Sequence, residues 1–466
     1  MCGVIGAFSR TSRHLPEDIF LGLYALQHRG QEAAGIAWTN ENGEVVCRKN
    51  PGLVHTALDQ AGISKIVCNS AIGHVRYATA GGSARSNIQP LKANTLTRGS
   101  FAVVHNGNLP DAGNLRNMLE GQGALFQSSS DTEVLLHLIS HQPTRPFLDA
   151  LTHALRRIRG AYAFLLLYDN KLIAARDPWG FRPLCIGVRD DITYVASESC
   201  AFDLLGAKLV RDVEPGEILI IDESGMQSFR IPVKAKRGYL CSFEFVYFAR
   251  PDSIIDGISV YDTRKMMGKA LARACMKCDG GCQHMKDPLV TGLPDSGTIA
   301  AQGFSEESGI PYESAIVRNR YSGRTFIEPT QRVRELGVLK KLNPMKYMIK
   351  DRDIYVIDDS IVRGTTSVKV TQLLKEHCGA NGVHMCISSP PVEYPCYYGI
   401  DTPSRKDLIA ARLSGDNLKK YLGVDSLFYL SKKDLVESIG LPADRLCTAC
   451  FDGNYMEEED HEQFDL

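Results

Sequence analysis

Residues 353–367 read DIYVIDDSIVRGTTS, and this stretch decides the fold of the second half of the chain. Residues 354–357 form a short apolar run rich in β-branched side chains, which predicts a buried strand. Two adjacent acids end the run, and a small hydroxyl-rich loop then opens a helical pattern. Backbone N–H groups at the start of a helix attract anions, and glycine lets a phosphate approach the backbone. The stretch therefore predicts a phosphate-binding loop in an α/β domain, with a buried strand and an ordinary capped helix as the alternative.

The two acids, Asp358 and Asp359, favour a ligand over that alternative. Neighbouring carboxylates repel each other unless a positive group lies close by. Their oxygens suit ribose hydroxyls or a hard cation. An apolar strand, two acids and a Thr/Gly loop resemble the 5-phosphoribosyl-1-pyrophosphate (PRPP) signature of type I phosphoribosyltransferases. The resemblance implies a PRPP site formed by Asp358, Asp359, Gly364, Thr365, Thr366 and Ser367.

A second loop of this kind lies at residues 289–298, LVTGLPDSGT. It combines an apolar strand, a tight loop and the start of a helix. By the same resemblance it binds the pyrophosphate group, and Ser296 joins Asp358 and Asp359 in holding Mg²⁺. Magnesium usually takes few protein ligands and several substrate oxygens, which suits one hydroxyl and two acids.

The 466-residue length predicts two or three domains. A net charge of −1 gives no electrostatic reason to expect nucleic acid or an anionic membrane as a partner. No apolar run approaches the ~20 residues of a membrane helix, and the N-terminus does not resemble a secretory signal. Because the chain shows no export signal, its cysteines are expected to serve as free thiols, metal ligands or catalytic residues and not as a disulfide framework. We expect a cytoplasmic protein.

The N-terminus, MCGVIGAF, suggests a catalytic cysteine. If Met1 is removed, Cys2 carries both a thiol and a free α-amino group. That amine has a reference pKa of ~7.7–8.0, so it can act as the base for its own thiol. The alternative is a buried cysteine at the start of a strand.

Four later segments change the balance between these alternatives. Residues 26–36 follow a helical pattern, residues 72–79 predict a strand entering a loop, residues 101–109 predict a strand meeting an Asn-Gly turn, and residues 128–133 predict a helix start. Together with Cys2 they resemble the glutaminase domain of class II glutamine amidotransferases, which are N-terminal nucleophile hydrolases. Residues 176–184 and 197–199 resemble further parts of this domain.

The resemblance assigns a role to each of these segments. It implies that Cys2 is the nucleophile, that Arg76 binds the α-carboxylate of glutamine, and that Asp131 binds its α-ammonium group. The Asn106 side chain and the Gly107 N–H group would form the oxyanion hole, which stabilises the tetrahedral intermediate. Arg29 would lie on the loop that shapes the glutamine pocket.

An aromatic-rich segment, residues 241–253, predicts a junction between two domains and resembles the same junction in glutamine PRPP amidotransferases. Tyr247 would lie near the path between the two sites. Residues 256–285 predict a helix with exposed Arg264, Lys265 and Lys269. The basic residues 317–344 predict a lid over PRPP.

The cysteines form two candidate metal sites. Near the end of the predicted helix, Cys275, Cys278, Cys282 and His284 have zinc-like spacing, although they also suit a plain helix end. The second set, Cys241, Cys396, Cys447 and Cys450, matches the cluster ligands of the iron–sulfur class of glutamine PRPP amidotransferases. Four thiolates suit a [4Fe-4S] cluster, with zinc as the competitor.

The resemblance covers nearly the whole chain. It implies an α+β domain at residues 2–235, with the four-layer αββα arrangement of N-terminal nucleophile hydrolases. A type I phosphoribosyltransferase domain of the α/β class, with a parallel sheet and a C-terminal cluster-binding segment, would follow at residues 236–466. The implied activity is hydrolysis of glutamine and transfer of ammonia to PRPP, giving 5-phosphoribosylamine in the first committed step of purine synthesis. Inhibition by purine nucleotides and a homotetramer or dimer are also implied.

Two other functions stay open at this stage. One is a glutamine amidotransferase for another phosphosugar, against which the Asp358-Asp359 loop argues. The other is a PRPP-sensing regulator, which would need neither Cys2 nor a glutamine pocket and would usually add a DNA-binding element.

Overall fold

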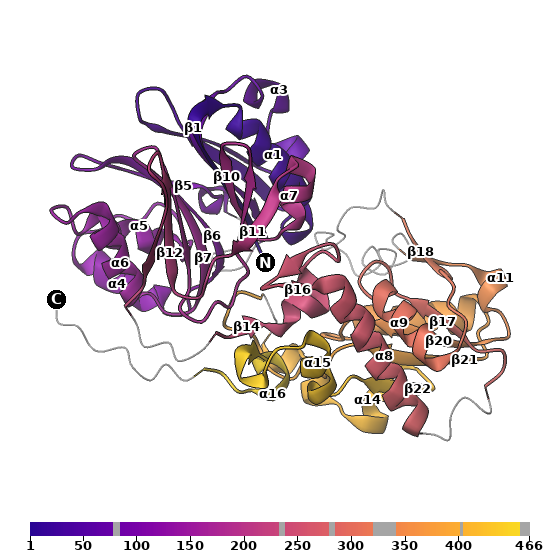
Figure 1. Cartoon of the computed structure of the whole chain (residues 1–466). Helices are drawn as coiled ribbons and strands as arrows, with labels where there is room; N and C mark the ends of the chain where they lie inside the picture. The colour runs from indigo at the N-terminus through magenta and orange to yellow at the C-terminus, as the bar shows by residue number, and fades with distance from the viewer. Residues whose placement is uncertain (78–83, 233–237, 279–284, 320–341, 401–403, 457–466) are drawn as a thin grey trace.

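A computed structural model of the chain describes residues 1–77, 84–232, 238–278, 285–319, 342–400 and 404–456 (Figure 1). The N-terminal half, coloured indigo to magenta, lies beside the C-terminal half, coloured from pink through orange to yellow, and the N-terminus lies between the two halves (Figure 1). No helix in the described part of the chain is long and apolar enough to cross a membrane.

The N-terminal half contains two antiparallel sheets. The seven-stranded sheet has the order β11-β9-β10-β1-β4-β2-β3, and the six-stranded sheet has the order β13-β12-β8-β7-β6-β5. Strands of the first sheet are β1 (Gly3–Arg13), β2 (Ala33–Thr39), β3 (Val45–Pro51), β4 (Cys68–Arg76), β9 (Cys185–Arg189), β10 (Ile192–Ala196) and β11 (Lys208–Asp212). Strands of the second are β5 (Leu91–Thr95), β6 (Gly99–Asn108), β7 (Ala161–Tyr168), β8 (Lys171–Arg176), β12 (Glu217–Asp222) and β13 (Gly225–Arg230).

Strand β1 shows how the sequence produces these layers. Val4 and Phe8 pack into a core shared with the second sheet, whereas Ile5 and Ala7 pack under the helices on the other face. This alternation is the period of two expected for a strand buried on both faces. The outer helices are α1 (Leu15–Ala25) and α7 (Cys200–Leu205) on the first sheet, and α4 (Ala112–Gly121), α5 (Glu133–Ser140) and α6 (Phe147–Arg157) on the second. The predicted αββα arrangement is confirmed.

The C-terminal half is built on a parallel sheet of order β17-β20-β21-β22. Its strands are β17 (Leu289–Gly292), β20 (Asp353–Asp358), β21 (Gly382–Ile387) and β22 (Ser426–Tyr429). In β20, Ile354 and Val356 face α12 (Thr365–Gln372) and α14 (Gly415–Leu422), while the alternate residues face α8 (Val260–Cys278), α9 (Thr298–Ser308) and α15 (Lys432–Ile439). The apolar run 354–357 is therefore a buried parallel strand, as its sequence predicts.

Short elements connect the two halves. Strand β14 (Leu240–Cys241) pairs in parallel with β23 (Leu446–Cys447), and α16 (Ala449–Asp452) follows it. Residues Glu244–Phe248 form a short helix, called the junction helix below. The predicted division at residues 235/236 falls in a segment outside the described residues, between β13 and β14.

Two predicted helices differ from the observed structure. Residues 26–36 contain only the turn Gln27–Arg29 before β2 begins, because β2 pairs on both sides with β3 and β4 and this pairing overrides the local helical pattern. Residues 254–259 form a hairpin, β15 (Ile254–Ile255) and β16 (Ile258–Ser259), so helix α8 starts at Val260 and ends at Cys278. Arg264 is buried and donates hydrogen bonds to the carbonyls of Phe245 and Ala249 at 2.7 and 2.8 Å, so the prediction that it is exposed is wrong.

Helices α8 and α9 touch through two glycines. A Cβ atom at Gly268 would lie 1.9 Å from the Ala300 carbonyl oxygen, and one at Gly303 would lie 2.0 Å from that of Lys265. Only glycine allows the two backbones to approach this closely.

Replacing Gly268 with alanine is therefore expected to separate the helices and to lower the free energy of unfolding by about 1–3 kcal/mol. The midpoint of urea denaturation measures the change. Gly113→Ala in α4 is the matched control, because nothing lies within 4 Å of its added Cβ and alanine favours a helix. Equal midpoints for the two variants would contradict the close helix contact.

Candidate active sites

Cys2 lies immediately before β1, at the end of the seven-stranded sheet. Gly3 pairs with Val75, so Cys2 lies beside Arg76 at the end of β4. The thiol donates to the Tyr77 carbonyl at 3.6 Å. Burial raises the pKa of the Cys2 thiol, while the N-terminal ammonium group and Arg76 act in the opposite direction. A nearby amine and guanidinium are the groups that favour a reactive thiolate.

Arg76 and Asp131, the two residues predicted to bind glutamine, both lie within electrostatic range of the Cys2 thiol. Arg76 lowers the pKa of the thiol and Asp131 raises it. Asp131 is fixed by the backbone, since its carboxylate accepts hydrogen bonds from the N–H groups of Leu109 at 3.0 Å and Thr132 at 2.8 Å. The structure thus brings the predicted nucleophile and both residues predicted to bind glutamine together.

The predicted oxyanion residues lie at the end of β6. Asn106 is fully buried, yet neither atom of its side-chain amide has a hydrogen-bond partner among the described residues. A buried amide without partners costs about 1–3 kcal/mol, so its presence indicates a ligand. His74 in β4 and the His105 carbonyl in β6 form a hydrogen bond of 3.2 Å across the two sheets. This bond holds the strand ends that carry Arg76 and Asn106 close to each other.

Arg29, predicted to lie on the loop that shapes the glutamine pocket, contacts the backbone of Cys2. Its Nε atom donates to the Cys2 carbonyl at 2.9 Å, and its terminal nitrogens donate to both oxygens of Glu244 at 3.0 Å. A further hydrogen bond joins it to Glu198. The guanidinium is fully buried in these contacts, so the geometry assigns Arg29 to holding the Cys2 backbone.

Sequence reasoning missed two buried charged residues that complete this network, Glu244 and Arg182. Glu244 in the junction helix also accepts a hydrogen bond from Arg182 at 3.3 Å, and Arg182 donates to the Tyr398 carbonyl at 2.8 Å. The only signal in the sequence was that residues 176–184 resemble a glutaminase segment, which does not identify a partner far away in the chain.

The paired acids lie at the carboxyl end of β20, the edge where open α/β sheets bind ligands. Burial raises the pKa of Asp358 well above its ordinary value, and the neighbouring Asp359 adds to the rise. Burial also raises the pKa of Asp359, against the hydrogen bonds from Ser296 and Ser360 and the charge of Arg264. The predicted Mg²⁺ ligands Ser296, Asp358 and Asp359 are therefore neighbours.

The predicted phosphate loop opens α12. Gly364 precedes the helix with a left-handed φ of 76°, and no side chain caps the first turn. Thr365 and Thr366 are exposed, and Ser367 is buried. An uncapped helix start leaves backbone N–H groups available for an anion. The capped-helix alternative does not describe this loop.

The second predicted loop lies against the first. Leu293 donates its N–H group to the Ile357 carbonyl at 2.8 Å. A Cβ atom at Gly297 would lie 2.2 Å from the same oxygen. The loops that follow β17 and β20 therefore face one ligand-binding edge.

The four cysteines predicted to hold a cluster are also neighbours. Cys241 pairs with Cys447 between β14 and β23, and burial raises the pKa of the Cys450 thiol with further rises from Cys241, Cys447 and Cys396. Arg182 lies within electrostatic range of Cys241 and Cys396. Within the part of the chain that the structure describes, no three His, Cys, Asp or Glu side chains converge on a single metal ion.

Two other predicted features cannot be placed. Cys275 is buried in α8, but Cys282 and His284 lie outside the described residues. Most of the basic segment predicted as a lid, residues 320–341, also lies outside them.

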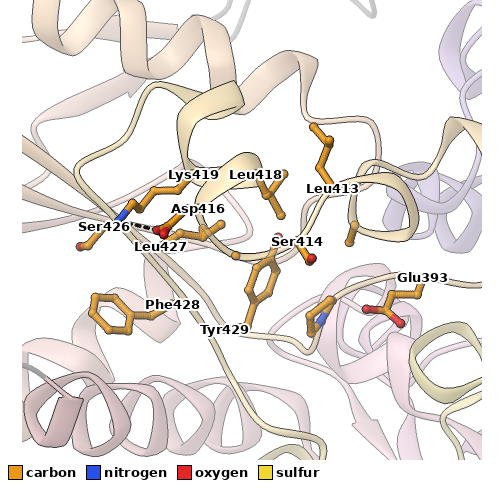
Figure 2. A pocket seen from close by; sticks show the side chains of 13 residues that line it. Glu393, Leu413, Ser414, Asp416, Leu418, Lys419, Ser426, Leu427, Phe428 and Tyr429 are labelled. Atoms are coloured by element: carbon orange, nitrogen blue, oxygen red, sulfur yellow. Dashed lines mark ion pairs between the residues drawn. The ribbon is translucent and has the colours of Figure 1, made fainter.

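A cavity of about 320 Å³ lies beside the edge strand β22 (Figure 2). Its lining includes Glu393, Tyr429 and the ion pair between Lys419 and Asp416 at 3.2 Å (Figure 2). None of the predicted site residues lines it, so this cavity is separate from the sites described above.

Comparison with known proteins agrees with both halves of the site. A family model described as a glutamine amidotransferase domain matches residues 74–203. The amidophosphoribosyltransferase of Bacillus subtilis (strain 168) is 45% identical over 461 residues, which is 98% of this chain and 94% of that protein. The Methanocaldococcus jannaschii amidophosphoribosyltransferase is 42% identical and covers 99% of each chain.

A solved structure gives the same result. The glutamine PRPP amidotransferase from B. subtilis, described as complexed with ADP and GMP, superposes with a TM-score of 0.89 at 44% identity and covers 97% of both chains. Both halves of the fold are therefore shared with one known architecture. The chain belongs to the amidophosphoribosyltransferase family.

Proposed function

We propose that the chain hydrolyses glutamine at Cys2 and transfers the ammonia inside the protein to PRPP, forming 5-phosphoribosylamine, pyrophosphate and glutamate. The observation that carries this proposal is the grouping of the Cys2 thiol with Arg76 and Asp131, the opposite charges that an amino acid requires. The paired acids of β20 supply a second site in the same chain. A single polypeptide with both sites suits a reaction in which one releases the nitrogen that the other consumes.

In the glutaminase half, the chemistry follows from the residues around Cys2. After removal of Met1, the new α-amino group takes the thiol proton, and the thiolate forms a C–S bond with the amide carbon of glutamine. The Asn106 side chain and the Gly107 N–H group stabilise the oxyanion. The protonated amine then returns its proton to the departing nitrogen, and water hydrolyses the thioester to glutamate.

In the phosphoribosyl half, ammonia attacks the anomeric carbon of PRPP while the bond to pyrophosphate breaks. The start of α12 binds the 5′-phosphate, and Ser296, Asp358 and Asp359 would hold Mg²⁺. When bound, Mg²⁺ supplies charge neutralisation for the leaving pyrophosphate. Ammonia in bulk water at neutral pH would be protonated and unreactive, so transfer inside the protein preserves its reactivity.

The cysteine set fits a cluster held by four thiolates, namely Cys241, Cys396, Cys447 and Cys450. Three of the thiols are buried and Cys396 is half-buried, and Cys241, Cys396 and Cys447 all lie within electrostatic range of Cys450. The cationic Arg182 lies within electrostatic range of Cys241 and Cys396 and would offset the charge of such a group. We infer a [4Fe-4S] cluster, with zinc as the alternative.

The remaining predictions concern regulation and assembly. The nucleotides in the B. subtilis complex support purine nucleotides as inhibitors of this chain. A homotetramer or dimer and a cytoplasmic location stay predictions.

Cys2→Ala is expected to abolish pyrophosphate release driven by glutamine and to leave the release driven by ammonium, because ammonium bypasses the thiol. Cys47→Ala, at a thiol in β3 that belongs to neither predicted site, is expected to keep both rates. Loss of both rates in Cys2→Ala, or of neither, would contradict the assigned role.

Asp358→Asn is expected to lower pyrophosphate release on the order of a hundredfold with either nitrogen source, because the lost charge weakens the grip on Mg²⁺ and PRPP. Glutamate formation from glutamine is measured in parallel and is expected to persist. Asp416→Asn, at a 94% exposed side chain, is the control for loss of one acid. A full rate in Asp358→Asn would contradict the site.

Cys450→Ser is expected to remove iron and acid-labile sulfide from the purified protein, together with its broad visible absorption. The control variant Cys47→Ser should keep the iron, the acid-labile sulfide and the visible absorption. A colourless wild-type protein that contains one zinc ion per chain would establish the alternative.

A further inference from the structure

The segment that follows Cys396 reaches across the domain junction to the end of β6. Tyr397 offers its carbonyl to the Asn108 side chain at 2.9 Å, next to the predicted oxyanion residue Gly107. Gly399 lies directly against Gly107, since a Cβ atom built on Gly399 would lie 3.0 Å from the Gly107 carbonyl carbon and 3.2 Å from its Cα and oxygen. The C-terminal half therefore supplies one wall of the strand that carries the oxyanion donor.

Strand β7 also lies very close to Gly107. A Cβ atom on Gly107 itself would lie 2.0 Å from the Ala161 carbonyl oxygen in β7. Gly107 is thus in close contact with both β7 and Gly399, and neither contact leaves room for a methyl group. A small displacement of either wall would turn the Gly107 N–H group away from the developing oxyanion.

Contacts with Phe181 and Arg182 hold the segment that follows Cys396 in place. The Tyr398 ring stacks on Phe181 with ring centroids 4.2 Å apart, and Arg182 donates to the Tyr398 carbonyl from two nitrogens. The Tyr398 N–H group donates to the Cys396 sulfur at 3.3 Å. These contacts fix the segment on the glutaminase half independently of any bound substrate.

Arg182 extends this arrangement to the nucleophile. It contacts Glu244, which holds Arg29, and Arg29 donates to the Cys2 carbonyl. The segment after Cys396 is therefore connected to both components of the glutaminase reaction, the oxyanion donor directly and the nucleophile through three buried side chains.

We propose that residues 397–399 are a positioning element of the glutaminase site, which sets the Gly107 N–H group at the distance that the oxyanion requires. The inference rests on the proposed roles of Cys2 and Gly107 and deepens them. The C-terminal half thereby contributes to glutamine hydrolysis without touching glutamine.

Gly399→Ala tests the proposal, because the added methyl group presses on the Gly107 backbone. The glutamine-dependent kcat is expected to fall roughly tenfold or more, with little change in the KM for glutamine, since the oxyanion forms only after binding. The ammonium-dependent rate and the iron content are expected to match the wild type. Inhibition by glutamate γ-semialdehyde, an aldehyde that adds to a thiol and forms an oxyanion, should weaken in parallel with kcat.

Gly440→Ala is the matched control. Gly440 also has a left-handed φ, 81° against 110° at Gly399, but nothing lies within 4 Å of its added Cβ. The Gly440→Ala variant places alanine in a left-handed backbone conformation but adds no contact with a neighbouring residue. It is therefore expected to keep the wild-type glutamine-dependent kcat. Asn108→Ala, which removes the hydrogen bond to Tyr397 without adding a methyl group, should lower kcat in the same direction by a smaller factor.

Three results would overturn the inference. An unchanged kcat in Gly399→Ala would show that the contact is not needed, and an equal loss in Gly440→Ala would assign the effect to strain. Equal loss of the glutamine and ammonium rates would indicate general misfolding. Failure of the proposed function itself is recognised separately, because Cys2→Ala would then retain its glutamine-dependent rate.

Discussion

The carboxylate of Glu244, buried between two guanidinium groups, is the interaction on which the junction of the two halves depends. Arg29 approaches it with two nitrogens and Arg182 with a third. None of the three side chains is exposed to solvent. Breaking such a buried pair costs about 3–5 kcal/mol, because the remaining charge has no water to stabilise it. Arg29 also donates a hydrogen bond to the Cys2 carbonyl, and Arg182 donates one to the Tyr398 carbonyl. The charge network therefore fixes the backbone of Cys2 and the domain interface together.

The same junction helix is connected to the phosphoribosyl site. Arg264 donates to the carbonyl of Phe245, the residue after Glu244, and its charge acts on Asp359. One short helix thus lies between a side chain that holds the Cys2 backbone and a side chain that influences the paired acids. This continuity gives a physical reason for the two reactions to share one chain, since the surroundings of Cys2 include Glu244 and Tyr398 from the C-terminal half.

Sequence patterns predicted the parts of the structure that depend on neighbouring residues. The alternation in β20, the acids at its end and the uncapped loop of α12 are local features, and Cys2, Arg76, Asp131 and Asn106 were found from a resemblance that preserves their order. Local patterns failed where distant pairing decides the outcome. Residues 33–36 belong to strand β2 instead of a helix because β3 and β4 flank them, and Arg29 meets Glu244 across 215 positions of sequence. No spacing within a short window contains that information.

The position of Met1 has a consequence for how the enzyme matures. The residue is 2% exposed, and burial lowers the pKa of its amino group to about 5. An aminopeptidase needs an extended, accessible chain end, which the finished fold does not offer. The proposed mechanism requires removal of Met1, so we expect this trimming to happen on the nascent chain, before β1 enters its sheet.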